Sequence, residues 1–223
     1  MSFKEGGWIL VLIGTVFSII GIGVVLAGFF TLSQRNEIEK LPVLTLANLQ
    51  DSPAGQAGVI EGKVSENNTL LFRGFVAYWQ ELYEGQDCSR DDDGNTDCTA
   101  IWSVRDRQIP SIWIDLPQGR VKVVNNGYEL YYPTTWQSQD QLVEFVTKRY
   151  SGLEVGKVVF VKGTTVTAAD APSFQAEFIA GVDRAGYLAG ERDSARGSFI
   201  FGGLFAFIGL ALLGGWILSQ VLK

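Results

Sequence analysis

The chain carries two long apolar runs without a charged side chain, residues 8–30 and 199–222. The first run has 23 residues, and at about 1.5 Å of rise per residue such a helix crosses a hydrocarbon core of about 30 Å. It is too long for the apolar region of a signal peptide. A buried core helix is the alternative, but the rest of the chain is too short to cover two such helices. We predict transmembrane helices at 8–32 and 198–222, flanking a soluble domain at 41–190.

The composition removes several classes of function. The net charge is −6, histidine is absent, and there are two cysteines. Nucleic-acid binding depends on clustered Lys and Arg side chains, so nucleic acid is not expected as a partner. Without histidine the chain has no Ser-His or Cys-His nucleophile and no imidazole metal ligand. Two cysteines alone cannot complete a structural zinc site, and we expect no cofactor.

The middle of the chain has the period-two alternation of β-strands. Residues 41–50 have a helical spacing and end at a turn. Beyond residue 57, alternating apolar residues predict strands near 57–64, 75–83, 99–104, 111–116, 120–124, 157–167 and 174–180. Many short strands in a domain of this size are typical of a small barrel or sandwich.

One segment of this domain has a helical pattern instead. Ser138 and Gln141 have the spacing of a capping box. The apolar residues that follow on one helical face are Leu142, Val143, Phe145, Val146 and Tyr150. The predicted fold class is therefore a membrane protein of α+β type. Two transmembrane helices flank a small β-barrel or OB-like antiparallel domain with one amphipathic helix.

Four segments between the two apolar runs resemble the BAM, or GIDE, domain (beside-a-membrane). They are 58–64 (GVIEGKV), 75–82 (FVAYWQEL), 109–116 (IPSIWIDL) and 153–156 (LEVG), the last leading to a strand that contains Gly163. The family is best known from mitochondrial membrane-anchored ubiquitin ligases, which carry a RING after the second span. The resemblance implies an anchored domain that acts by interaction. Because Lys223 follows the second span directly and no RING ligands are present, ubiquitin transfer is not expected.

Cys88 and Cys98 lie at the base of a polar insert, residues 84–97. A bridge between them would close an eleven-residue loop. In the chain-entropy model it would stabilise the fold by about 3 kcal/mol in an oxidising compartment. We predict a disulfide here, and the alternative is a pair of thiols on a cytoplasmic hairpin.

The insert also has the oxygen-rich composition of a calcium loop. The candidate ligands are Asp91, Asp93, Asn95 and Asp97, around a glycine turn. When the EF-hand pattern is aligned on Asp93 and Gly94, however, Ser89 replaces the first acidic ligand and Ala100 replaces the bidentate glutamate. A calcium site is therefore one interpretation of this segment, and the alternative is an acidic loop that is simply exposed to solvent.

Small residues recur at four-residue spacing in both apolar runs. They are Gly14 and Ser18 in the first run, and Ser198, Gly202 and Ala206 in the second. Such stripes let helix backbones approach closely in lipid, although glycine is common in membrane helices in general. In the middle of the chain, we expect the four tryptophans at 79, 102, 113 and 136 to belong to the core rather than to an aromatic ligand face.

The functional prediction is a non-catalytic, membrane-anchored interaction or scaffold protein. Its expected partners are the lipid bilayer and either another membrane protein or a second copy. One alternative is a membrane-associated enzyme or E3-ligase-like relative, in which a serine or carboxylates would act. The carboxylates in question are Glu61, Glu81, Asp106, Asp115 and Glu177. A further alternative is a calcium-responsive adaptor.

The charge pattern and the cysteines predict opposite orientations. Basic residues flank the domain side of the runs at 35, 40, 184, 192 and 196, whereas the tails carry Lys4 and Lys223. By the positive-inside rule the domain is cytoplasmic, but long domains translocate largely regardless of charge. The cysteine pair and the family layout favour the outside. We predict a two-pass integral membrane protein with cytoplasmic termini and an exoplasmic domain.

Overall fold

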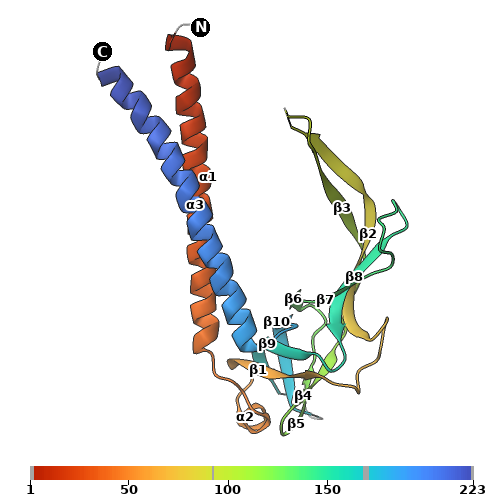
Figure 1. The fold of residues 1–223 in the computed structure, drawn as a ribbon. Coiled ribbons are helices and arrows are strands. Elements are labelled where there is room, and N and C mark those ends of the chain that lie inside the picture. The colour runs from red at the N-terminus through yellow and green to blue at the C-terminus, as the bar shows by residue number, and fades with distance from the viewer. Residues whose placement is uncertain (1–2, 92, 168–170, 222–223) are drawn as a thin grey trace. The chain divides into compact units, whose positions relative to one another are not determined.

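The computed structural model describes residues 3–91, 93–167 and 171–221 (Figure 1). The chain divides into two compact units, a helical unit of Met1–Lys40 with Ala185–Lys223 and a β-rich unit of Leu41–Arg184. Its elements are α1 (Phe3–Lys40), α2 (Leu46–Asp51), β1 (Ala57–Val64), β2 (Phe75–Arg90), β3 (Thr96–Gln108), β4 (Ile112–Leu116), β5 (Gly119–Val123), β6 (Glu129–Tyr131), β7 (Thr134–Gln137), β8 (Lys148–Glu154), β9 (Val158–Val166), β10 (Ser173–Ala180) and α3 (Arg184–Val221).

The helical unit consists of two 38-residue helices. By length and composition both are long and apolar enough to cross a membrane. Each helix continues beyond its apolar run through charged residues, and Arg35 forms an i,i+4 ion pair with Glu39 at 2.9 Å inside α1. The helices run antiparallel, so that the start of α1 and the end of α3 lie at the same end of this unit (Figure 1).

Five strands of the β-rich unit close into a barrel-like sheet. Strand β1 pairs antiparallel with β4 and β9, β4 with β5, and β9 with β10. A parallel pairing of β5 with β10 completes the circuit, and β6 extends the sheet by pairing parallel to β10. The barrel-like domain is thus confirmed, but the antiparallel prediction is wrong for these two pairs. Residues 168–170 lie outside the described part of the chain.

A second sheet has the strand order β3-β2-β8-β7. Its β2–β3 hairpin is the longest in the described chain, and its far end projects beyond the other strands of the sheet (Figure 1). Burial follows this division, since the first residues of β2 are buried and the last five are exposed.

The core lies inside the barrel. Its fully buried side chains include Ile60, Val64, Ile112, Ile114, Val121, Val123, Tyr128, Leu153, Val159, Val161, Phe174 and Ile179. Most of them are inward positions of the alternating barrel strands, whereas Tyr128 precedes β6 and Leu153 belongs to β8 of the second sheet. Short helix α2 closes one side through buried Leu49, and the Thr45 hydroxyl and the Asn48 side chain cap its first turn.

The predicted amphipathic helix at 138–150 is wrong. Strand β7 ends just before this segment and β8 begins within it, and the two strands pair antiparallel, with Trp136 opposite Tyr150. The intervening residues form a loop in which Phe145 has a positive φ of 57°. Within the loop, the backbone nitrogen of Phe145 donates to the Tyr83 carbonyl of β2, and the backbone nitrogen of Thr147 donates to the Val143 carbonyl. These bonds satisfy backbone groups that a helix would otherwise pair internally. The apolar residues of the expected helix face at 142, 143, 145 and 146 are exposed.

Candidate functional site

The two long helices meet along a seam of small residues. A Cβ added at Gly21 would collide with the backbone nitrogen of Ala206 and would lie 2.6 Å from the carbonyl oxygen of Gly202. A Cβ at Gly209 would lie 2.5 Å from the backbone nitrogen of Ser18 and 2.6 Å from the carbonyl oxygen of Gly14. The backbones therefore touch, and larger side chains are excluded sterically.

The structure places all five small residues named from the sequence at this seam, since Ser198 packs against Gly28. Sequence analysis missed Gly21, Gly28 and Gly209. Their signal was a seven-residue period, with glycine at 14, 21 and 28 and again at 202 and 209. Two helices that wind around each other keep such a period at their contact.

Phenylalanine pairs flank the seam. The rings of Phe17 and Phe205 are 5.4 Å apart, and those of Phe29 and Phe199 are 4.9 Å apart. The outer faces of both helices stay uncovered, and Phe30 and Phe207 are 66% and 71% exposed. Within the apolar runs, the facing sides of the two helices are thus packed against each other, and their outer sides expose large apolar side chains.

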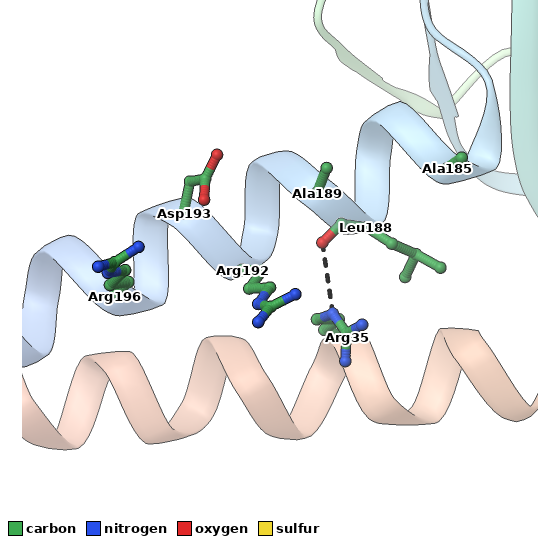
Figure 2. Close-up of a pocket in the computed structure, with 7 residues that line it drawn as sticks. All are labelled: Arg35, Ala185, Leu188, Ala189, Arg192, Asp193 and Arg196. Atoms are coloured by element: carbon green, nitrogen blue, oxygen red, sulfur yellow. Dashed lines mark hydrogen bonds between the residues drawn. The ribbon is translucent and has the colours of Figure 1, made fainter.

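A cationic groove lies between the charged ends of these helices (Figure 2). It has a volume of about 780 Å³ and is lined by Arg35, Ala185, Leu188, Ala189, Arg192, Asp193 and Arg196. The Arg35 guanidinium donates a hydrogen bond of 3.3 Å to the Leu188 carbonyl and also pairs with Glu39. Arg192 and Arg196 form no hydrogen bond or ion pair with the described residues.

The four tryptophans of the β-rich unit are not in the core, contrary to the prediction. Each is half-buried, and three lie beneath cationic groups. The Arg73 guanidinium is 4.2 Å from the ring centre of Trp136, and that of Arg149 is 4.3 Å from Trp102. Trp113 has Arg120 and Lys122 near its ring. Such contacts stabilise aromatic rings at a surface by about 0.5–1 kcal/mol each.

An aromatic cluster covers one part of the second sheet. Phe72 stacks on Tyr150 with ring centres 4.1 Å apart, and Tyr78 and Trp136 join them. Burial raises the pKa of Tyr78 and of Tyr150, and the nearby Asp106 carboxylate raises both further. Arg73 adopts a positive φ of 45° to reach Trp136. Trp, Tyr and Arg are the side chains that most often dominate protein interfaces.

The cysteines sit opposite each other near the end of the β2–β3 hairpin. The structure joins Cys88 to Cys98 by a disulfide, with their sulfur atoms at bonding distance and their Cα atoms 4.1 Å apart. The hairpin residues around them are exposed on both strands.

The acidic turn beyond the disulfide is organised by its own hydrogen bonds. The Asp91 carboxylate accepts from the backbone nitrogen of Asn95 at 2.6 Å and from its side-chain amide at 3.0 Å. These bonds lower the pKa of Asp91. No three Cys, Asp or Glu side chains in the described ranges converge as a metal site would require. Asp92 lies outside the described residues, and calcium binding stays a prediction.

The carboxylates considered for catalysis are spread over separate strands. Glu81 pairs with Arg149 at 2.8 Å, and Glu177 pairs with Lys162 at 3.0 Å. Asp106 accepts a hydrogen bond of 3.3 Å from the Tyr78 hydroxyl. Each of these three carboxylates has a partner on the neighbouring strand. The contacts join β2 to β8, β9 to β10 and β2 to β3, so they do not converge on one site.

Comparison of the chain with family models, with curated proteins and with solved structures gave no match.

Proposed function

We propose that the chain is a two-pass membrane protein whose β-rich domain is held beside the bilayer and acts by binding another membrane protein or a second copy, without chemistry of its own. The observation that supports this best is the pair of bilayer-length helices. Their backbones contact each other along the seam, while their outer faces expose large apolar side chains such as Phe30 and Phe207. Lipid is the solvent that suits such a surface.

The β-rich domain supports a role in binding rather than in catalysis. The pairing circuit β1-β4-β5-β10-β9 agrees with an OB-like barrel, and inward aliphatic and aromatic side chains fill it. Active sites usually combine an apolar pocket with convergent polar groups, whereas the polar and aromatic groups described in this domain lie on its surface, where a protein partner can contact them. The resemblance to the BAM or GIDE domain supports the same role.

Membrane integration is tested first, with full-length protein in isolated membranes. We expect the chain to stay in the membrane after alkaline carbonate extraction and to need detergent for purification. A chain that is released by carbonate and stays monodisperse in plain buffer would contradict the proposal.

Binding is tested with a photo-crosslinking residue in place of Phe145, which is 62% exposed in the loop between β7 and β8. The control replaces exposed Lys157, a polar position before β9. Irradiation of intact membranes should join Phe145 to one defined protein, a second copy included, and Lys157 should give no such product. Crosslinks from both positions to the same mixture of proteins would reject a specific surface.

A further inference from the structure

We propose that the cationic groove between α1 and α3 binds the phosphate of an anionic lipid headgroup, with Arg192 and Arg196 as its principal ligands. This inference rests on the proposed membrane anchoring. All lining residues belong to the helical unit, so the groove is formed within one compact unit of the chain.

The first argument is the position of the arginines along the helices. Arg35 follows Phe30, the last residue of the first apolar run, and Arg196 precedes Phe199, the first residue of the second. At about 1.5 Å per residue the backbone at Arg196 and Arg35 lies roughly 5–8 Å beyond the apolar runs, and the backbone at Arg192 lies roughly 10 Å beyond. The headgroup region of a bilayer has about this depth on each side. The groove is therefore at the level of lipid phosphates.

The second argument is charge. Three guanidiniums line the groove with one carboxylate, Asp193, which projects away from α1 in Figure 2. Arg35 is already engaged by Glu39 and by a backbone carbonyl. The Arg192 and Arg196 side chains remain without an internal acceptor among the described residues. Their planar forks match phosphate oxygens and bind them in a bidentate manner.

The third argument concerns which phosphate compound fits. Leu188, Ala185 and Ala189 give the groove an apolar side next to its cationic one. A lipid presents the same combination, since its phosphate continues into a glycerol ester and acyl chains. Basic pockets between membrane helices on the cytoplasmic or matrix side are a known form of anionic headgroup site, so this proposal agrees with the cytoplasmic orientation that the positive-inside rule favours. Inorganic phosphate shares the anionic chemistry but lacks the apolar part.

The test uses the full chain in detergent micelles, titrated with phosphatidylglycerol and measured by native mass spectrometry. We expect a phosphatidylglycerol adduct and no equivalent phosphatidylcholine adduct. Arg192→Gln with Arg196→Gln should weaken the adduct about 30-fold. Each basic residue near anionic headgroups contributes about 1 kcal/mol of binding free energy, and the loss of two corresponds to this factor. Arg192→Lys with Arg196→Lys should restore part of the affinity, because charge is kept and the fork is lost.

The matched control is Arg90→Gln with Arg120→Gln, which removes two positive charges from the β-rich unit. It should bind phosphatidylglycerol like the unaltered chain. Equal loss in both double variants would overturn the proposal, because binding would then reflect net charge alone. Displacement of the lipid by inorganic phosphate at equal concentration would overturn the assignment to lipid. Carbonate extraction of the same variants separates this site from anchoring, which both should retain.

Discussion

Gly163 lies where β9 passes closest to β10 in the barrel. A Cβ at this position would collide with the carbonyl oxygen of Gln175 and lie 2.8 Å from the ring of buried Phe174. Neither atom can move aside within the packed core, so we expect Gly163→Ala to lower the free energy of unfolding by about 3 kcal/mol. Gly127→Ala is the control, because no atom lies within 4 Å of its added methyl group. It should change that energy by less than about 0.5 kcal/mol. Urea unfolding of the full chain in micelles, followed by tryptophan fluorescence, measures both, and similar values for the two variants would contradict this reading.

Tyr128 is the largest fully buried side chain of the barrel, and its hydroxyl donates a hydrogen bond of 2.8 Å to the Pro110 carbonyl. Burial raises the pKa of Tyr128 far above its usual value near 10. The folded state therefore disfavours the phenolate, and stability is retained below about pH 10 and lost as the pH rises above it. Tyr78 and Tyr150 contribute in the same direction.

We expect Tyr128→Phe to cost about 1–3 kcal/mol near neutral pH, because the Pro110 carbonyl loses its buried donor. The same variant should lose stability less steeply above pH 10, by up to about 1.4 kcal/mol per pH unit. Unfolding midpoints between about pH 7 and 11 measure both effects. An alkaline slope identical to that of the unaltered chain would show that Tyr128 does not govern it.

At the scale of elements, the disulfide acts on the hairpin and not on the barrel. Cys88 and Cys98 lie among exposed residues at the far end of β2 and β3, away from the core cluster. We expect Cys88→Ala with Cys98→Ala to speed amide hydrogen exchange in residues 84–101, while the amides of β1 and β9 keep their protection. A uniform loss of protection would show instead that the bridge supports the whole domain.

The pairing of α1 with α3 depends on the missing side chain at Gly21. In a background of Cys88→Ala and Cys98→Ala, a bifunctional thiol reagent should crosslink the double variant Phe17→Cys and Phe205→Cys, since the side chains at these positions meet with ring centres 5.4 Å apart. Adding Gly21→Val should abolish the crosslink, because a Cβ there meets the backbone of α3. Adding Gly23→Val should preserve it, since its Cβ has no neighbour within 4 Å. Crosslinking in all three would argue against a glycine-dependent seam.

At the scale of the whole molecule, the side of the membrane on which the β-rich domain lies can be tested directly. If the domain is exoplasmic, an impermeant maleimide should label Cys88 and Cys98 in intact cells only after an added reductant has opened the bridge. Reductant is needed because the disulfide leaves no thiol to react. Labelling that requires a permeabilised membrane would place the domain in the cytoplasm, as the positive-inside rule suggests.

The sequence by itself predicted the long apolar helices, most barrel strands and some of the small residues at the seam, although it missed Gly21, Gly28 and Gly209. These are periodic or length-dependent features, and each is decided by neighbours along the chain. Only the tertiary structure decided that residues 138–150 form a loop and the start of β8, because β8 pairs with β7 on one side and on the other with β2, which lies far earlier in the chain. The groove at Arg35, Arg192 and Arg196 likewise depends on two helices separated by the whole β-rich domain. Contacts of this kind join residues that are far apart in the chain. A pattern within one short segment of the sequence therefore does not encode them.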